Sequence, residues 1–220
     1  MDETGGAPPP RADVVVIGGG VVGVFAALTL AERGVSVVLC EKGRVAAEQS
    51  SRNWGWIRKQ GRDPRELPLM IESVGLWRRW AAEAGEDFGF QQGGCLYLAE
   101  TDDEMARHAG WLEKAGGFQL DTTLLDAAGV GRVLDRDDHP FRGGLYTPSD
   151  AQAEPRLAVP ALARHAETLG AVIREGCAVR AVLREGGRVT GVMTEQGAVK
   201  ADAVILAGGA WSRSFLENLG

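Results

Sequence analysis

Short apolar runs alternate with amphipathic stretches along this chain. Near the N-terminus, Ala12–Ile17 is a nearly continuous apolar run, and Val35–Cys40 is a second one. Runs of this length, rich in β-branched residues, are typical of strands that are buried on both faces of a parallel sheet. Between them, Val21–Arg33 is rich in Ala and Leu, and it is followed by Gly34, a residue that commonly ends helices. The pattern predicts a strand, a helix and a second strand.

A comparable pattern returns toward the C-terminus. Pro155–Leu169 is predicted as a helix, and Ala171–Arg174 as the strand that follows it. Ala203–Ala207 is a last buried strand. Three shorter strands at hairpin spacing precede it, joined by turns that contain Gly, and they are predicted over 178–183, 188–194 and 198–200. Strands that alternate with helices indicate an α/β fold, here a Rossmann-like domain with a β-meander.

The middle of the chain is less regular. Gly43–Gly61 has no clear hydrophobic period, and we interpret it as a long functional loop. Capping sequences predict two helices: Asp63–Glu66 opens one that reaches about Ala84, and Thr101–Glu104 opens one that ends at Ala115. Strands are predicted at Gly94–Ala99 and Leu145–Thr147. This mixture indicates an inserted α+β layer.

Glycine is the outlier of the composition, with 31 of 220 residues, about twice the usual ~7%. Part of the excess forms Gly18-x-Gly20-x-x-Gly23 between the first strand and the first helix. Gly18 permits a tight turn, Gly20 lets a pyrophosphate approach the backbone, and Gly23 lets the helix pack closely on the strand. The phosphates then face the positive end of the helix.

An acidic residue completes this fingerprint. Glu41 ends the second strand, 23 residues after Gly18, where a carboxylate can accept hydrogen bonds from a ribose. The same carboxylate repels a 2′-phosphate, so NADP is disfavoured. Strand, glycine turn, helix, strand and acidic residue together predict a site for a dinucleotide.

Charge and cysteine content exclude other classes of protein. Acidic residues outnumber basic ones by 30 to 24, a net charge of −6, so no nucleic-acid partner is expected. Cys40, Cys95 and Cys177 lack disulfide or metal-ligand spacing, and no metal is expected. Met1–Pro10 lacks the features of a signal peptide, and no apolar run reaches the ~18 residues of a membrane span. The expected location is the cytoplasm.

Two further segments distinguish FAD from NAD. Ser50–Trp56 reads Ser-Ser-Arg-Asn-Trp-Gly-Trp, and Val204–Ser212 follows the predicted meander. With the fingerprint, these segments resemble the FAD-dependent amino acid oxidoreductases, the superfamily of D-amino acid oxidase, glycine oxidase and sarcosine oxidase. The resemblance begins at Asp13 and continues to the end of the chain. It is strongest over 13–41, 50–58 and 203–212, and loosest over 88–140.

The resemblance implies roles for individual residues. The glycine turn would hold the FAD pyrophosphate, Glu41 the adenosine ribose, and Arg52 and its neighbours the pyrophosphate and the flavin ring. The implied cofactor-binding residues are Gly18, Gly20, Val22, Gly23, Glu41, Lys42, Ser51, Arg52, Asn53, Gly55, Val179, Ala207, Gly208 and Trp211. Some relatives attach FAD covalently through a histidine in the first loop. That loop has no histidine here, so FAD is expected to bind non-covalently; no catalytic residue is assigned.

The resemblance also implies a reaction and a division into domains. A C–N bond of an amino acid or related amine would be oxidised by hydride transfer to flavin N5, and oxygen or another acceptor would take the electrons. Residues 12–87 and 151–220 would form the FAD-binding domain, 88–150 would form part of a substrate-binding domain, and 1–11 a disordered leader. Relatives continue well beyond the equivalent of Gly220, so an N-terminal portion, truncated at the C-terminus, is expected.

Two alternatives stay open at this stage. One is another FAD-dependent oxidoreductase of the same fold, such as an NAD(P)H-dependent hydroxylase. The other is an inactive FAD-binding fragment or a subunit of a larger complex. The residues favour no particular substrate, stereochemistry or oligomeric state.

Overall fold

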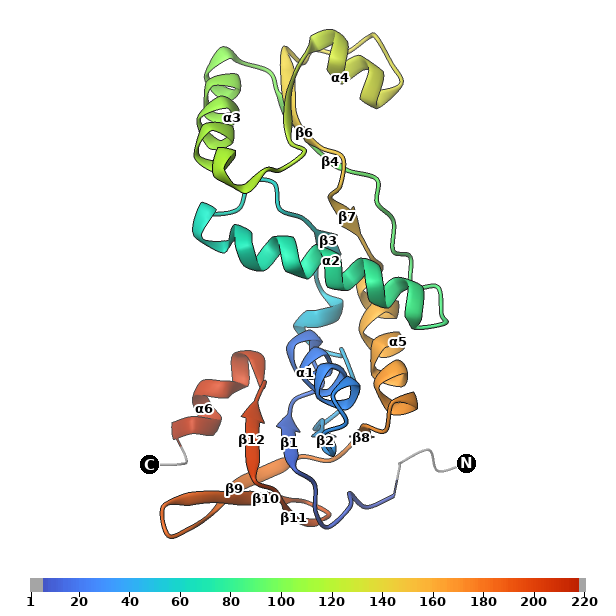
Figure 1. The fold of residues 1–220 in the computed structure, drawn as a ribbon, viewed down its shortest axis with the longest axis vertical. Coiled ribbons are helices and arrows are strands. Elements are labelled where there is room, and N and C mark those ends of the chain that lie inside the picture. The colour runs from blue at the N-terminus through green and yellow to red at the C-terminus, as the bar shows by residue number, and fades with distance from the viewer. Residues whose placement is uncertain (1–5, 218–220) are drawn as a thin grey trace. The chain divides into compact units, whose positions relative to one another are not determined.

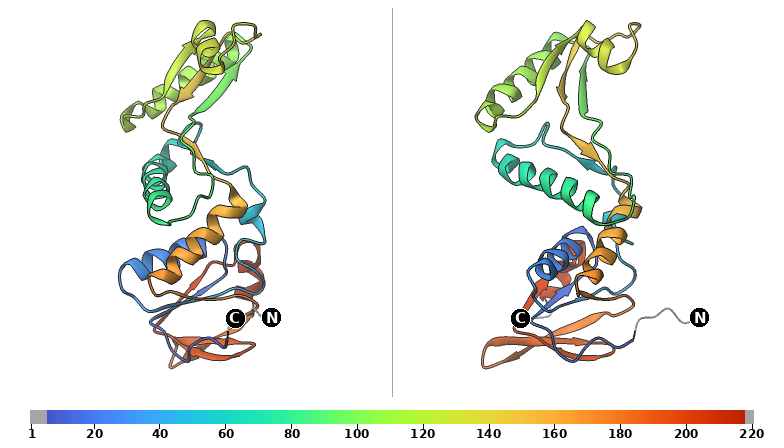
Figure 2. Two further views of the ribbon diagram at one scale, coloured as in Figure 1. Left: turned by 90° about the vertical axis from the view of Figure 1, so that its right-hand side faces the viewer. Right: turned by 45° about the vertical axis from the view of Figure 1, so that its right-hand side comes forward.

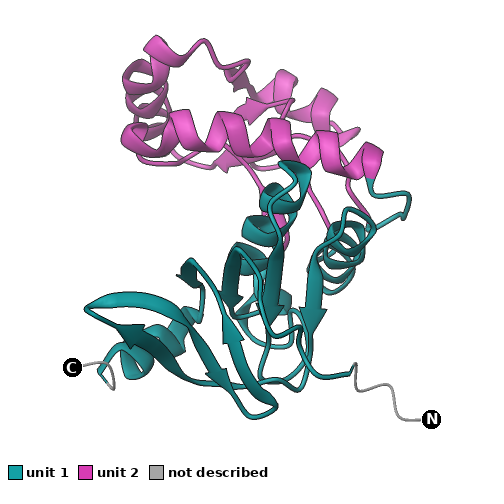
Figure 3. Ribbon diagram, turned by 60° about the horizontal axis from the view of Figure 1, so that its bottom comes forward, with its two compact units in different colours: residues 1–54, 84–88, 154–220 teal, residues 55–83, 89–153 magenta. Residues whose placement is uncertain are grey.

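The computed structural model describes residues 6–217, and the chain forms two compact units. Unit 1 comprises residues 1–54, 84–88 and 154–220, and unit 2 comprises residues 55–83 and 89–153 (Figure 3). The sequence-based division kept 12–87 together, whereas in the structure 55–83 belongs to unit 2. The reason is that β3 (Trp56–Ile57) pairs with β7 (Ala151–Gln152), and this pairing joins two segments that are distant in sequence.

Unit 1 is built on a four-stranded parallel sheet with the order β12-β1-β2-β8 (Figure 1). Its strands are β1 (Val14–Ile17), β2 (Val37–Cys40), β8 (Val172–Arg174) and β12 (Ala203–Leu206). Val15 lies between Val38 of β2 and Val204 of β12. Parallel sheets of this kind are covered on both faces, which explains the continuous apolar runs in the sequence.

Two different layers cover this sheet (Figure 2). Helices α1 (Val21–Glu32) and α5 (Pro155–Thr168) contact each other on one face. The meander of β9 (Val179–Glu185), β10 (Arg188–Thr194) and β11 (Gly197–Lys200) covers the other.

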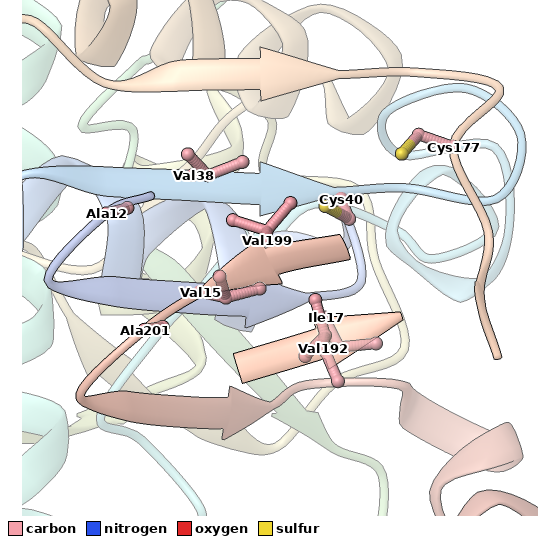
Figure 4. Packing of buried hydrophobic residues seen from close by; sticks show 9 residues of the cluster. All are labelled: Ala12, Val15, Ile17, Val38, Cys40, Cys177, Val192, Val199 and Ala201. Atoms are coloured by element: carbon pink, nitrogen blue, oxygen red, sulfur yellow. The ribbon is translucent and has the colours of Figure 1, made fainter. Parts of the chain in front are cut away.

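A buried cluster joins the meander to the sheet (Figure 4). Val15 and Val38 of the sheet are 0% and 1% exposed, and Val192 and Val199 of the meander are both 0% exposed. Burying a side chain of this size stabilises a fold by roughly 1.5–3 kcal/mol. The predicted α/β class, a Rossmann-like domain with a β-meander, is confirmed.

The remaining elements of unit 1 are short. They are two 3₁₀ turns, η1 (Gln49–Ser51) and η4 (Gly209–Trp211), and α6 (Ser212–Glu217). Residues 1–5 of the predicted leader lie outside the described residues. The carbonyl of Pro10 accepts a hydrogen bond of 2.9 Å from the N–H of Lys200, and Arg11 forms a parallel bridge with the same residue. The hydrogen-bonded backbone therefore begins before Ala12.

Unit 2 is an α+β layer. Its three-stranded sheet has the order β4-β6-β5, with β4 (Cys95–Ala99), β5 (Thr123–Asp126) and β6 (Gly143–Thr147). Its helices are α2 (Leu67–Glu83), α3 (Asp102–Ala115) and α4 (Ala127–Leu134), with 3₁₀ turns η2 (Pro64–Glu66) and η3 (Gly116–Phe118). The predictions of β4, β6, α2 and α3 are confirmed, whereas β3, β5, α4 and β7 were not predicted, and β3 lies in the segment interpreted as a loop. These four elements are short: the strands have two to four residues and α4 has eight, two of them glycines.

Candidate cofactor site

The glycine turn after β1 packs too tightly for side chains. Gly18 has φ of +109°, and a Cβ there would lie 2.5 Å from the carbonyl oxygen of Ala207. A Cβ on Gly23 would lie 1.9 Å from the carbonyl oxygen of Gly18. Both positions therefore require glycine, because β1, the start of α1 and the end of β12 meet there.

The helix α1 begins directly after Gly20 of this turn. Gly20 is the N-cap residue and has an extended conformation; as a glycine, it has no side chain that could cap the helix. The N–H of Val21 donates to Ser50 Oγ at 2.8 Å. The first N–H groups of a helix have no intrahelical acceptor, and the helix dipole is positive at this end. The turn is therefore suited to an anionic group such as a phosphate.

Glu41 is fixed beside this turn. Its two carboxylate oxygens accept hydrogen bonds from the N–H groups of Gly19 and Gly43, each at 2.7 Å, and the residue is 7% exposed. A carboxylate offers about four acceptor positions. The two backbone bonds therefore orient Glu41 and leave acceptor capacity for a ribose hydroxyl.

A cleft of about 250 Å³ opens at the carboxyl ends of β1, β2 and β12, the edge where parallel α/β sheets bind ligands. Eight of the predicted cofactor-binding residues line it: Gly18, Gly20, Glu41, Lys42, Val179, Ala207, Gly208 and Trp211. All eight belong to unit 1. The structure thus brings together residues from the glycine turn, from β9 and from the segment after β12.

A cation–aromatic contact lies at this cleft. Lys42 Nζ is 4.2 Å from the ring centroid of Trp211. The same ammonium is 3.1 Å from Glu48 Oε1, and this hydrogen bond lowers the pKa of Glu48 below its usual value. Lys42 therefore contacts residues that come from two separate segments of the cleft lining.

The other predicted residues do not line the cleft. Val22 and Gly23 lie in the first turn of α1. The side chains of the first loop bind carbonyls of the loop itself: Ser51 Oγ donates to Glu48, Arg52 Nη2 to Ala47, and Asn53 Nδ2 to Ser50. Gly55, with φ of +71°, belongs to unit 2. Their contact with a flavin stays a prediction.

Ser50 and Cys40 line the cleft but were not assigned from the sequence. The signal for Ser50 was its place in the matched loop, directly before Ser51. Cys40 is a buried thiol whose pKa is raised to about 12, first by burial and then by the neighbouring thiol of Cys177. Cys40 is therefore a neutral, apolar part of the wall at physiological pH.

Unit 2 contains a buried polar network of its own. Asp150 is 0% exposed and accepts hydrogen bonds from the N–H groups of Lys59 at 2.9 Å and Gln60 at 3.1 Å. Its Oδ1 is 3.7 Å from Lys59 Nζ, and that side chain is 9% exposed. Burial raises the pKa of Asp150. The network fastens the segment after β3 to the turn between β6 and β7.

Among the residues that the structure describes, no group of three or more His, Cys, Asp or Glu side chains is arranged to hold a metal ion. Within residues 6–217, no helix is long and apolar enough to cross a membrane.

Known proteins are similar to this chain in sequence and in fold. Mitochondrial dimethylglycine dehydrogenase of Mus musculus is 27% identical over 223 residues, which cover 99% of this chain and 26% of that protein. Glycine oxidase of Geobacillus kaustophilus is 29% identical over 230 residues, which cover 96% of this chain and 58% of that protein. The L-amino acid deaminase from Proteus myxofaciens in complex with anthranilate matches with a TM-score of 0.93 and 34% identity, over 100% of this chain and 50% of that one.

This chain thus spans less than two thirds of each of these relatives. Residues 13–220 match the family described as DAO: FAD dependent oxidoreductase. The family match covers both units, and it agrees with a fold in which a glycine turn and an acidic residue meet at one cleft. The chain therefore belongs to the DAO family of FAD-dependent oxidoreductases.

Proposed function

We propose that this chain binds FAD, with the adenosine and pyrophosphate in the cleft of unit 1. We further propose that it contributes this site to an enzyme that oxidises a C–N bond of an amino acid or related amine. One observation carries the proposal: the N-terminus of α1, the bare surface of Gly20 and the carboxylate of Glu41 all meet at the same cleft.

Different lining residues would bind different parts of the cofactor. The N–H groups at the N-terminus of α1 would bind the pyrophosphate, and Glu41 would accept hydrogen bonds from the adenosine ribose. Lys42, Val179 and Trp211 would surround the adenosine. Ligand pockets for drug-sized molecules measure ~300–1,000 Å³, and this cleft has about 250 Å³. A cleft of this size suits the adenosine side of FAD and leaves the flavin ring outside it.

The chain's own residues bind and orient, and the cofactor supplies the chemistry. Bound FAD would supply the two-electron oxidation of the substrate. The names of the relatives, glycine oxidase and L-amino acid deaminase among them, support amino acids or amines as the substrate class. Oxygen or another acceptor would take the electrons.

Titration with FAD tests the binding site. We expect the 220-residue chain to quench flavin fluorescence with a Kd in the low-micromolar range or below. Glu41→Gln keeps the size of the side chain but removes the charge that strengthens its hydrogen bonds, each worth roughly 1.5–3 kcal/mol. The variant should therefore bind FAD about tenfold more weakly or worse. Glu66→Gln, at an exposed position of unit 2, is the matched control. Absence of FAD binding by the unaltered chain, or equal affinity in both variants, would contradict the proposal.

Anaerobic reduction tests the substrate class. We expect the flavin of the enzyme that contains this chain to lose absorbance when amino acids or N-methylated amino acids are added. Addition of NADPH should leave the absorbance unchanged. Rapid bleaching by NADPH alone would instead support the hydroxylase alternative.

A further inference from the structure

Unit 2 contains a pocket of its own, with a volume of about 270 Å³. All of its lining residues belong to unit 2, whereas the residues of the dinucleotide cleft belong to unit 1. The side chains of Trp56, Arg58, Cys95 and Gln152 line the pocket, together with two glycines and Ala151. Burial raises the pKa of the Cys95 thiol, so this thiol is neutral at physiological pH. The lining therefore carries the positive charge of Arg58 and no negative charge.

Arg58 is a half-buried cation without an acidic partner. Within the part of the chain that the structure describes, its guanidinium forms one hydrogen bond, from Nη1 to the carbonyl oxygen of Gln60, and no ion pair. Its Nε is buried and has no acceptor there. An arginine side chain has five N–H donors, so most donors of Arg58 are left without an acceptor from these residues.

The nearby acidic residue Asp150 is bound elsewhere. It precedes Ala151 of the pocket lining. Its carboxylate accepts hydrogen bonds from the N–H groups of Lys59 and Gln60, and its Oδ1 lies 3.7 Å from Lys59 Nζ. The charge of Asp150 is therefore compensated by Lys59, and that of Arg58 is not. A charge removed from water is unfavourable unless an opposite charge or hydrogen bonds compensate it, so the pocket favours an anion.

Two aromatic rings hold the guanidinium in place. Arg58 Cζ lies 5.1 Å from the ring centroid of Trp56 and 5.6 Å from that of Tyr97. Trp56 belongs to β3 and Tyr97 to β4, so the rings come from two separate segments of unit 2. Contact with an aromatic face uses the face of a guanidinium, whereas its N–H donors lie in its plane. These contacts therefore fix Arg58 and leave its donors available to a ligand.

We propose that this pocket is a carboxylate-binding site, in which Arg58 binds the carboxylate of the amino acid that is oxidised. The planar donors of an arginine match the two oxygens of a carboxylate, and the single positive charge of the lining matches a monoanion. The pocket thus favours amino acids over amines that lack a carboxylate. Assignment of the bound carboxylate to the substrate rests on the proposed function, whereas the carboxylate site itself does not.

Titration of the 220-residue chain with small ligands, followed by NMR, tests this site without any activity measurement. We expect propanoate to bind with a Kd in the millimolar range and to shift the Nε–H signal of Arg58, which is identified by its absence from the spectrum of Arg58→Gln. Propanamide has the same shape without the charge, and it should bind about tenfold more weakly or worse. Alanine should likewise bind more tightly than ethylamine, which lacks the carboxylate.

Three variants assign the binding to Arg58. Arg58→Gln should bind propanoate about tenfold more weakly or worse. Arg58→Lys keeps the charge but not the planar pair of donors, so its affinity should lie between those of Arg58→Gln and the unaltered chain. Arg132→Gln, at an exposed position of α4, is the matched control and should bind propanoate as the unaltered chain does. Circular dichroism and urea unfolding of each variant identify any loss of folding.

The outcomes separate this site from the proposed function. Absence of propanoate binding by the unaltered chain, equal affinity for propanoate and propanamide, or equal affinity of folded Arg58→Gln and the unaltered chain would each overturn the carboxylate site, and FAD binding would stand. Binding of propanoate by a chain that does not bind FAD would support the site and contradict the proposed function. Propanoate binding that is lost when FAD is added, but not in Arg58→Gln, would place the carboxylate in the cleft of unit 1 and overturn this inference.

Discussion

At the scale of single residues, the glycine turn shows how geometry restricts residue choice. A Cβ on Gly23 would lie 1.9 Å from the carbonyl oxygen of Gly18. This contact is with backbone, so no rotamer can relieve it. Gly34 also adopts a positive φ, +73°, but a Cβ there would meet nothing within 4 Å. A steric clash therefore excludes a side chain at Gly23, whereas at Gly34 only the positive φ favours glycine.

Alanine substitutions at these two positions should therefore differ. Gly23→Ala forces α1 away from β1, and we expect it to lower the free energy of unfolding by about 3 kcal/mol and to abolish FAD binding. Gly34→Ala carries only the strain of a left-handed conformation, roughly 1–2 kcal/mol. Urea unfolding of the two variants and of the unaltered chain measures both losses of unfolding free energy. Equal losses in the two variants would show that the predicted steric clash does not operate.

The raised pKa of the Cys40 thiol leads us to expect that the stability of the fold depends on pH. Its pKa is raised from 9.0 to about 12 in the folded protein, so the folded state retains the proton at a pH where the unfolded chain has lost it. Stability should therefore fall as pH rises from about 9 to about 12, by at most ~1.4 kcal/mol per pH unit.

The slope of unfolding free energy against pH, compared between two proteins, distinguishes the effect of this thiol from that of other groups that titrate at alkaline pH. Cys40→Ala should show a shallower decline of unfolding free energy between pH 9 and pH 11 than the unaltered chain, whatever its stability at neutral pH. Parallel declines in the two proteins would argue against a raised pKa at Cys40.

At the scale of elements, local signals predicted the longer helices and the buried strands. The capping box of α3 is present as expected: Thr101 Oγ1 accepts from the N–H of Glu104, and the Glu104 carboxylate accepts from the N–H of Thr101. The strand β5 and the helix α4, 4 and 8 residues long, were not predicted, although Asp126 caps α4 by accepting a hydrogen bond from the N–H of Gly129. The strand β5 pairs with β6, a contact between distant segments that no local pattern encodes.

The capping box of α3 can be tested by two matched variants. Thr101→Ala leaves a first-turn N–H without its acceptor and should lower the free energy of unfolding by ~1 kcal/mol. Glu104→Gln should stay within about 0.5 kcal/mol of the unaltered chain, because Gln also completes a capping box. Thermal or urea unfolding measures the difference. A larger loss in Glu104→Gln than in Thr101→Ala would be inconsistent with this account.

At the scale of the whole molecule, the two units depend on different interactions. Unit 1 has an apolar three-layer core and the proposed cofactor site. Unit 2 contains the buried Lys59–Asp150 pair, whose partners are 91 residues apart in sequence. Removal of one partner of a buried pair leaves the other without compensation.

Substitution of this pair should destabilise one unit and spare the site of the other. Asp150→Asn is expected to cost about 3 kcal/mol in the unfolding of unit 2, whereas its affinity for FAD should stay within about twofold. Asp121→Asn removes the more exposed acidic neighbour, 3.8 Å from Lys59 Nζ with a side chain that is 43% exposed, and should cost less than ~1 kcal/mol. Urea unfolding and FAD titration are compared on the same samples. A large loss of FAD affinity in Asp150→Asn would contradict the independence of the site in unit 1.

The sequence by itself determined the α/β class and the glycine turn, and it predicted Glu41 and a dinucleotide site, because each depends on residues that are neighbours in the chain or at one helical or strand period. Only the tertiary structure placed 55–83 in unit 2, brought Ser50 rather than Ser51 to the cleft, and paired Lys59 with Asp150. The Lys42–Trp211 contact likewise joins residues that are distant in sequence. Contacts of this kind arise when separate segments pack against each other, and no period or spacing along the chain records them.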